Sequence, residues 1–330
     1  MEAVNSTVSC RPSGSTAPFT VLYALAFLVG LGGTLTALWG VARCRGDRRS
    51  IDVYLLNLLA SALLLTLALP FKIATSLGVA SWGLQVFHCQ ASAVVVYISL
   101  YVSLLLLALV SADRYLQISQ SPRLRCAREP GLARVLSAVA WALVLFIMVP
   151  NMAIPTRDVP EKQWLRCAEL KREEGLHWHR LASFLGTGIF LNASLAVLAA
   201  NGLALRRLWA NHHRRHGADG RWLDARRTAR HVATVTLAYV VCFVPYHAVR
   251  TPYTLTQGRP IHDCPQWNHL YLAKEATLLL AVLHVCFNPV LYFHFSRSFR
   301  QRLKQTFRPK GNSSAPPRDM KTSLPSVRPP

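Results

Sequence analysis

Long apolar segments alternate with short polar ones along this chain of 330 residues. A helix needs about 20 predominantly apolar residues to cross the hydrocarbon core of a bilayer. Seven segments meet this requirement, and they take up most of the chain. The pattern predicts an all-α membrane protein, a seven-transmembrane helix bundle without a separate soluble domain. We expect its helices at approximately Phe19 to Arg43, Ile51 to Leu77, Val86 to Ile118, Gly131 to Ile154, Arg180 to Trp209, Arg226 to Thr256 and Asn268 to His294.

Polar segments at the two ends complete the domain organisation. Residues 1–18 are polar and lead into an apolar run longer than that of a cleavable signal peptide, so we expect the first helix to act as an uncleaved signal anchor. The bundle is expected over residues 19–295. An amphipathic segment at 296–308 predicts a short eighth helix, and the Pro, Ser and Lys content of 309–330 predicts a disordered tail.

Composition and charge agree with a membrane location. Hydrophobic residues make up 52% of the chain and charged residues only 16%, which is unusual for a soluble domain of this size. The formal net charge is +22, but the basic residues fall in alternate loops instead of on one soluble face. The positive-inside rule therefore predicts an extracellular N-terminus and a cytoplasmic C-terminus. The anionic inner leaflet explains much of the charge, so a lipid bilayer is the expected partner and nucleic acid is not.

The predicted topology places four cysteines and one glycosylation sequon on the extracellular side. The cysteines are Cys10, Cys89, Cys167 and Cys264. Extracellular cysteines form disulfides that persist, and four cysteines allow three pairings, which the sequence leaves open. Pairing of Cys89 with Cys167 and of Cys10 with Cys264 would clamp the outer segments around one pocket. Asn5, in the sequon Asn5-Ser6-Thr7, is predicted to be extracellular and glycosylated.

Enzymatic function finds little support in the sequence. His212, His213 and His216 lie in an arginine-rich inner loop, where a solvated face is expected instead of a metal site. We predict no catalytic residue, metal or cofactor. A helical secondary transporter is the alternative from another class, but transporters tend to have internal repeats and broken helices in matching halves. The seven predicted helices are odd in number and do not repeat, which argues against a transporter.

Three motifs lie in the predicted membrane helices, one closing the third helix, one within the sixth and one near the end of the seventh. They are Asp113-Arg114-Tyr115, Cys242-Phe243-Val244-Pro245-Tyr246-His247 and Asn288-Pro289-Val290-Leu291-Tyr292. An Asp-Arg pair at the edge of the hydrocarbon is costly, which favours a functional role over a packing role. Together these motifs resemble those of the rhodopsin-like, class A G-protein-coupled receptors, over essentially the whole chain.

The resemblance implies a conformational switch and a set of partners. Arg114 is expected to pair with Asp113 at rest and to face a heterotrimeric G protein when the sixth helix swings outward at Pro245. Asn288-Pro289 is expected to weaken the seventh helix so that Tyr292 can reorient. The alternative for Asp113-Arg114 is a surface ion pair without function. Arrestin is a further possible partner, and the implied location is the plasma membrane.

Further motifs resemble those of the metabotropic purinergic receptors, particularly the branch that inhibits adenylyl cyclase and its orphan members. They are Leu69-Pro70-Phe71-Lys72-Ile73, Val149-Pro150-Asn151-Met152, Gly175-Leu176-His177-Trp178-His179, residues 243–257 and Lys274-Glu275-Ala276-Thr277-Leu278. This resemblance implies coupling to an inhibitory G protein. It also implies the ligand contacts Tyr97, Lys171, His179, His247, Arg250, Tyr253 and Lys274.

The residue pattern itself predicts an anionic ligand. His247 and Arg250 recur at helical spacing above Pro245, and Lys72 and Lys274 lie at a similar depth. An arginine there can grip a phosphate or carboxylate through two parallel hydrogen bonds. A nucleotide, a peptide with an acidic end and an anionic lipid would each suit such a pocket.

Alternatives to ligand contact remain open for several of these residues. Lys72 and Lys274 could instead extend to the membrane interface while Glu275 neutralises a neighbour. His247, close to a proline kink, could be a hydrogen-bonded structural histidine. Ser183 replaces an asparagine of the purinergic receptors, which weakens the case for a nucleotide.

The chain departs from the class A pattern at several positions within the helices. Thr34 and Ala62 replace the usual asparagine and aspartate of the first two helices, so the carboxylate that holds a sodium ion in that family is absent. Ser103 and Asn288 can still bind water, but neutral oxygens hold sodium poorly at this depth. Asn192 and Ala200 replace a proline and a tyrosine of the fifth helix. We expect ligand binding that is insensitive to sodium and a weakened active-state network.

Overall fold

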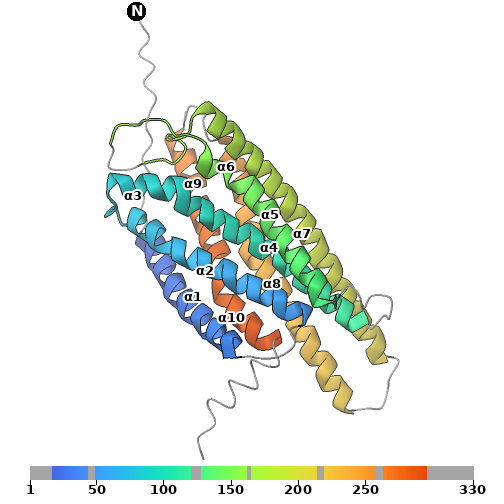
Figure 1. Cartoon of the computed structure of the whole chain (residues 1–330). Helices are drawn as coiled ribbons and strands as arrows, with labels where there is room; N and C mark the ends of the chain where they lie inside the picture. The colour runs from blue at the N-terminus through green and yellow to red at the C-terminus, as the bar shows by residue number, and fades with distance from the viewer. Residues whose placement is uncertain are drawn as a thin grey trace, which may run out of the picture.

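Long helices run side by side through the part of the chain that the structure describes (Figure 1). The computed structural model describes residues 17–43, 49–119, 128–161, 165–213, 219–256 and 263–295, without the side chains of 211–225, 231, 288 and 292–295. Within these ranges seven helices are long and apolar enough to cross a membrane, as predicted. The elements are α1 (Ala17–Arg43), α2 (Ser50–Ser76), α3 (Trp82–Phe87), the π-helix η1 (His88–Ser92), α4 (Ala93–Ser119), α5 (Pro130–Met148), α6 (Pro150–Ala153), α7 (Glu173–His213), α8 (Asp219–Thr256), α9 (Cys264–Val282) and α10 (His284–Phe295).

Several spanning helices consist of more than one element. The third comprises α3, η1 and α4, the fourth α5 and α6, and the seventh α9 and α10. α5 ends before Pro150, because the proline nitrogen carries no hydrogen to donate to the preceding turn, while Val149 itself keeps helical backbone angles. A further break at Leu283 separates α9 from α10. No strand is present in the described part of the chain.

Some helices begin earlier than the hydropathy pattern predicts. α7 begins at Glu173 instead of Arg180, α8 at Asp219 instead of Arg226, and α9 at Cys264 instead of Asn268. The extra turns are polar and extend beyond the apolar span, where backbone hydrogen bonding can continue the helix without help from the bilayer. For α9, Asp263 caps the N-terminus by accepting a hydrogen bond from the backbone N–H of Gln266.

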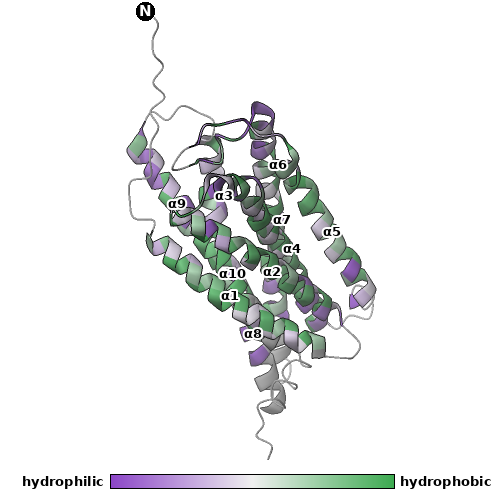
Figure 2. Ribbon diagram, turned by 60° about the vertical axis from the view of Figure 1, so that its left-hand side comes forward, coloured by the Kyte–Doolittle hydropathy of each residue, from purple (hydrophilic) through white to green (hydrophobic). Residues whose placement is uncertain are grey.

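The interior and the exterior of the bundle are both apolar. α4 lies at its centre and contacts α2, α5, α7 and α8. Apolar side chains also point outward, and Figure 2 shows hydrophobic residues along the middle of the helices with polar residues towards their ends. Outward apolar surface of this extent fits a bilayer as the solvent.

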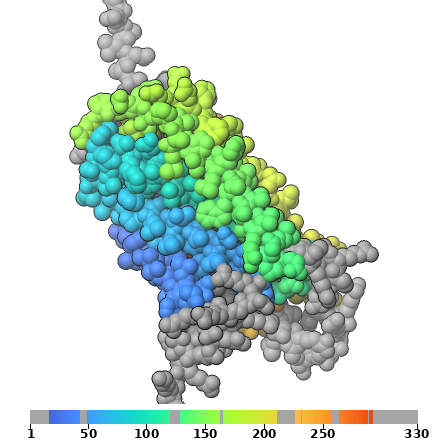
Figure 3. Space-filling model, in the orientation of Figure 1, coloured from blue at the N-terminus to red at the C-terminus, as the bar shows by residue number. Residues whose placement is uncertain are grey.

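A disulfide ties the segment between α6 and α7 to the bundle. Cys89 and Cys167 are bonded, which confirms one of the predicted pairings. Thr156 and Lys171 form an isolated antiparallel bridge in the same segment, supported by a 2.7 Å hydrogen bond from Arg157 N to Leu170 O. Figure 3 shows this segment covering one end of the molecule, which we name the disulfide end.

The remaining extracellular and cytoplasmic predictions fall largely outside the described residues. Cys264 is disulfide-bonded, whereas Cys10, its predicted partner, lies outside them. Asn5, the predicted eighth helix at 296–308 and the tail at 309–330 also lie outside the described part. These assignments stay predictions.

Candidate functional site

A cavity of about 570 Å³ opens at the disulfide end of the bundle. Side chains from α1, α2, α4, α7, α8 and α9 line it, together with residues of the segment between α6 and α7. Cys89 and Cys167 are part of its wall, so the disulfide holds that segment against the cavity. Six of the seven predicted ligand contacts are among the lining residues: Tyr97, Lys171, His179, Arg250, Tyr253 and Lys274.

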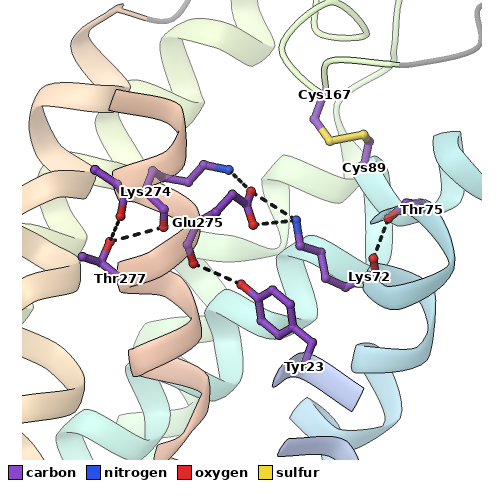
Figure 4. A network of polar contacts seen from close by, with 9 residues as sticks. Tyr23, Lys72, Thr75, Cys89, Cys167, Lys274, Glu275 and Thr277 are labelled. Carbon is purple, nitrogen blue, oxygen red and sulfur yellow. Dashed lines mark hydrogen bonds and ion pairs between the residues drawn. A yellow bond between two sulfur atoms is a disulfide. The ribbon is translucent and has the colours of Figure 1, made fainter. Parts of the chain in front are cut away.

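Two lysines on one side of the cavity share a single carboxylate. Glu275 is buried, with 4% of its surface exposed, and the Lys72 Nζ lies 2.9 Å from its Oε2. Lys274 pairs with the other oxygen, Oε1 (Figure 4). The Tyr23 hydroxyl donates to the Glu275 backbone carbonyl at 3.4 Å, which adds α1 to this contact between α2 and α9. We name Lys72, Lys274 and Glu275 the ion triad. Its net charge is one positive unit, because a single carboxylate faces two ammonium groups.

A second group of polar side chains lies on the other side of the cavity. Arg250 is 8% exposed, and its Nη2 lies 3.2 Å from the Nε2 of His179. The guanidinium can only donate, so Nε2 accepts and Nδ1 of the neutral imidazole carries the proton. Nδ1 lies 3.3 Å from the Asn151 Oδ1, which also accepts a long, 3.5 Å contact from the Lys171 Nζ. We name Arg250, His179, Asn151 and Lys171 the arginine region.

The two regions differ in how their positive charge is balanced. No described carboxylate pairs with Arg250 or Lys171, whereas Glu275 balances one charge of the ion triad. Aromatic rings face Arg250 instead, with the guanidinium carbon 4.9 Å from the centroid of Tyr97 and 6.0 Å from that of Tyr253. A ring face is only a weak counterpart for a cation. An incoming anionic group therefore meets uncompensated charge in the arginine region.

Lys171 lies just before α7, outside the membrane-spanning segments, where the positive charge of Arg250 acts on its ammonium group. Burial lowers the pKa of its ammonium group below the usual value of 10.5, and the positive charge of Arg250 lowers that pKa further. Keeping the ammonium group charged in the ligand-free cavity therefore costs free energy, and a bound anion would reduce that cost. The backbone bridge between Lys171 and Thr156 holds the side chain at the cavity in spite of this cost.

Tyr253 lies between the two regions. The Arg250 guanidinium carbon lies 6.0 Å and the Lys274 Nζ 5.2 Å from the centroid of its ring. Lys274 also lies 4.6 Å from the ring of Tyr271, which stacks on Trp267. These rings form an apolar wall that would face the uncharged part of a ligand.

His247 is the predicted ligand contact that does not line the cavity. Its Nδ1 donates to the Phe243 carbonyl at 2.9 Å, and its ring stacks on Phe190 with centroids 4.0 Å apart. The alternative of a hydrogen-bonded structural histidine describes this position better. Tyr246, one residue earlier, lines the cavity, and its hydroxyl has no hydrogen-bond partner in the described part. The four-residue spacing from Tyr246 to Arg250 was the sequence signal that would have identified it.

Asp113, Arg114 and Tyr115 of the predicted switch lie near the end of α4, at the opposite end of the bundle. The Asp113 carboxylate accepts a 2.5 Å hydrogen bond from Ser50, and Arg114 donates to Gln117. The guanidinium of Arg207 lies over the ring of Tyr115 at 5.0 Å and thereby joins α7 to α4. The resting pair of Asp113 with Arg114 stays a prediction. Pro245 and Pro289 lie inside α8 and α10, and the side chains of Asn288 and Tyr292 are outside the described part.

The centre of the bundle carries neutral polar groups where the class A pattern has an aspartate. Ala62 and Thr34 are fully buried, and the Thr34 hydroxyl has no partner in the described part. The Ser103 hydroxyl lies 2.6 Å from that of Ser61 and 3.0 Å from the Nε2 of His284. His284 was not among the residues predicted from the sequence. A histidine within the apolar run from Ala276 to Phe287 was the available signal.

Comparison with known proteins agrees with this architecture. Residues 33–292 match the 7 transmembrane receptor (rhodopsin family). The chain is 45% identical over 303 residues to G-protein coupled receptor 171 of Mus musculus, a match that covers 92% of this chain and 93% of the relative. It is 32% identical over 257 residues to purinoceptor 14 of Bos taurus, with 77% and 75% covered. It is 31% identical over 285 residues to purinoceptor 13 of Homo sapiens, with 86% and 80% covered.

Proposed function

Because the chain belongs to the seven-transmembrane receptors of the rhodopsin family, we propose that it binds an anionic extracellular ligand at its disulfide end and activates a heterotrimeric G protein at the opposite end. It is a multi-pass receptor of the plasma membrane and not an enzyme. The resemblance to purinergic receptors supports the inhibitory class of G protein. Membership of a receptor family also removes most of the support for a secondary transporter.

The observation that carries the ligand proposal is the uncompensated charge of the arginine region. Arg250 and Lys171 line the cavity without a described carboxylate partner. A carboxylate or phosphate that binds Arg250 would gain charge-assisted hydrogen bonds and relieve the repulsion between these two cations. The ion triad would contribute less, because Glu275 already occupies its lysines.

Three ligand classes could supply such an anionic group. The purinoceptor relatives make a nucleotide one candidate, while a peptide with an acidic end and an anionic lipid offer the same chemistry. The wall of Tyr253, Tyr271 and Trp267 would receive a planar or apolar portion of any of them. The shared requirement is one anionic group placed at Arg250.

A guanine-nucleotide-exchange screen tests this proposal. Membranes that contain the receptor are mixed with a purified inhibitory heterotrimer and exposed in turn to nucleotide, acidic-peptide and anionic-lipid libraries. For any active compound, Arg250→Ala is expected to lower potency at least about tenfold, as loss of a charge-assisted bidentate contact does. Arg250→Lys should recover part of the potency, and Lys274→Ala should have a smaller effect because Glu275 already holds that lysine.

Arg157→Ala is the matched control for the arginine substitution. Arg157 is an exposed arginine of the segment between α6 and α7 and does not line the cavity. This variant should respond like the unchanged receptor at equal surface expression. An active anionic compound whose potency withstands both Arg250→Ala and Lys274→Ala would overturn the proposed site. Uptake of the compound without nucleotide exchange would instead favour a transporter.

A further inference from the structure

His284 joins three spanning helices at the centre of the bundle. The residue is buried, with 2% of its surface exposed, at the first position of α10. Its Nδ1 lies 2.6 Å from the Ala281 carbonyl, and its Nε2 lies 3.0 Å from the Ser103 hydroxyl of α4. Ser103 in turn lies 2.6 Å from the hydroxyl of Ser61 on α2. We name Ser61, Ser103 and His284 the central cluster.

The hydrogen-bond partners determine the direction of these bonds. A carbonyl can only accept, so Nδ1 of His284 donates to Ala281. In the neutral imidazole, Nε2 then accepts from the Ser103 hydroxyl, which leaves the Ser103 oxygen to accept from Ser61. The single Ser61 proton lies within reach of both Ser103, at 2.6 Å, and the Leu58 carbonyl of its own helix, at 3.1 Å, and this assignment directs it to the shorter contact. Each bond between helices in the chain from α2 through α4 to α10 thus has one donor and one acceptor. The cluster is satisfied without an ion.

The break in the seventh helix explains why a side chain is needed here. α9 ends at Val282, and α10 begins at His284 after the single residue Leu283. An interruption of helical hydrogen bonding leaves backbone carbonyls that need other donors. The His284 imidazole supplies one to Ala281 and, through its other nitrogen, fixes the start of α10 against α4.

His284 also contacts the helix that leads to the ligand cavity. Its ring lies 5.4 Å, centroid to centroid, from the ring of Phe243 on α8. Phe243 is buried and precedes Tyr246 and Arg250, which line the cavity on the same helix. A movement of α8 at the cavity would therefore press on or release the imidazole.

The ends of the helices opposite the cavity are joined in this arrangement. Asn201 of α7 donates to Thr236 of α8 at 2.7 Å, and Ser194 of α7 lies 3.0 Å from the Tyr239 hydroxyl of α8. Arg207 links α7 to α4 through Tyr115 and through a 3.4 Å hydrogen bond to the Ser119 carbonyl. An outward swing of α8 would have to break such contacts, so the structure describes the closed arrangement.

We propose that His284 is a positioning residue that holds the closed arrangement without a bound cation, by joining α2, α4 and α10 and supporting Phe243 of α8. The consequence for signalling rests on the proposed coupling to a G protein. The contacts of His284 themselves do not depend on that coupling. None of the described side chains that hydrogen-bond to His284 or pack on its ring carries a charge, so this restraint depends on hydrogen bonds and ring packing.

Two readouts test the proposal on the full-length receptor in lipid nanodiscs. Basal nucleotide exchange with a purified inhibitory heterotrimer reports signalling. A bimane fluorophore on Arg230→Cys, an exposed position of α8, reports helix opening whether or not a G protein couples, with the labelled parent chain as the blank. The substitutions are His284→Phe, which keeps a ring beside Phe243 but loses both nitrogens, and Ser103→Ala, which removes the partner hydroxyl.

Both substitutions are expected to shift the fluorescence towards the solvent-exposed value and to raise basal exchange about threefold, the factor that one interhelical hydrogen bond of average strength contributes in a bilayer. The double variant should exceed neither single variant by much, because both remove the same bond. His284→Gln, which keeps a polar group within reach of Ser103, should restore most of the parent behaviour. Ser137→Ala is the control, because this buried serine of α5 bonds to the Ala133 carbonyl of its own helix.

The outcomes separate this inference from the proposed function. Unchanged fluorescence in both His284→Phe and Ser103→Ala overturns the inference. A fluorescence shift without increased exchange supports the positioning role and contradicts coupling to the chosen G protein. If His284→Phe does not fold, Ser103→Ala still decides, because loss of one hydroxyl leaves the packing of the ring in place. A ¹⁵N spectrum of the imidazole that shows the proton on Nε2 instead of Nδ1 would also refute the assigned bonds.

Discussion

Lys171 shows how a single side chain can be held in an unfavourable state at a binding site. It lines the cavity, its ammonium group contacts only the Asn151 amide oxygen among the described polar partners, and Arg250 repels it. Burial and this repulsion lower the pKa of the group, so folding with the charged form costs free energy. Glu275 shows the opposite case, since it has two lysine partners.

Lys171→Met is expected to stabilise the ligand-free receptor near neutral pH. The free-energy cost of the charged ammonium is fully present below its lowered pKa, begins to fall as the pH rises past that pKa, and disappears only near the usual value of 10.5, where the unfolded chain also loses the proton. The midpoint of thermal unfolding should therefore rise by about 1–2 °C at pH 7.5, and the gain should shrink towards pH 10. Thermal unfolding in detergent at several pH values measures this. Lys171→Arg, which keeps its charge throughout, should show no gain, and a gain from Met that grows with pH would contradict the assigned cost.

At the level of elements, the close approach of α1 to α10 depends on glycine. A Cβ atom at Gly33 would lie 2.7 Å from the Pro289 Cγ, and one at Gly30 would lie 2.7 Å from the Val285 Cγ2. The Pro289 side chain is closed into a ring on its own backbone nitrogen, so it cannot rotate away from the contact. These glycines let the first helix pack beside the proline of the seventh, one of the predicted switch residues.

Gly33→Ala and Gly32→Ala form a matched pair for this contact. Alanine in a helix is favoured over glycine by about 0.5–1 kcal/mol, and at Gly32 no atom lies within 4 Å of the position that a methyl group would occupy, so Gly32→Ala should be neutral or stabilising. Gly33→Ala should cost about 1–3 kcal/mol through overpacking against Pro289. Thermal unfolding of the two variants, in the same detergent, distinguishes them. Equal effects at both positions would show that α1 does not depend on this close approach.

At the scale of the whole molecule, charged groups gather at the two ends and neutral polar groups occupy the centre. The ion triad and the arginine region lie at the disulfide end, and Asp113 and Arg114 at the opposite end. Between them lies the central cluster, which contains no carboxylate among the described residues. A sodium ion at this depth would need a carboxylate to offset its dehydration.

Sodium is therefore expected to have little effect on this receptor. Replacement of sodium chloride by N-methylglucamine chloride at constant ionic strength should change agonist affinity and basal exchange less than about twofold. Ala62→Asp, which adds a carboxylate to the buried surface of α2, is the variant in which sodium dependence should appear. Radioligand competition, once an agonist is known, and basal exchange measure this. A large, reproducible sodium shift in the unchanged receptor would count against the neutral centre.

The seven spanning helices were predictable because their signal lies in local composition. Topology placed Cys89 and Cys167 on the same side of the membrane, but their pairing was one of three possibilities until the structure showed it. A run of about 20 apolar residues is costly to expose to water and can satisfy its backbone in a bilayer only as a helix. The positions of Arg250, Lys274 and Tyr253 at the cavity followed from helical spacing and from the family resemblance. The helix starts at Glu173 and Cys264 were missed because polar turns beyond the bilayer carry no hydropathy signal.

The sequence by itself determined that this protein crosses the membrane seven times and carries cations towards one end of its helices. Only the tertiary structure decided which of those cations are balanced, because Lys72 and Glu275 are 203 residues apart in the chain. It also placed Tyr246, and not the predicted His247, at the cavity wall. Finally, it brought His284 into hydrogen-bond contact with Ser103, 181 residues away in the chain. Hydropathy is a property of each segment, whereas hydrogen bonds and ion pairs act over a few ångströms between helices. Their partners are therefore settled only when the helices pack.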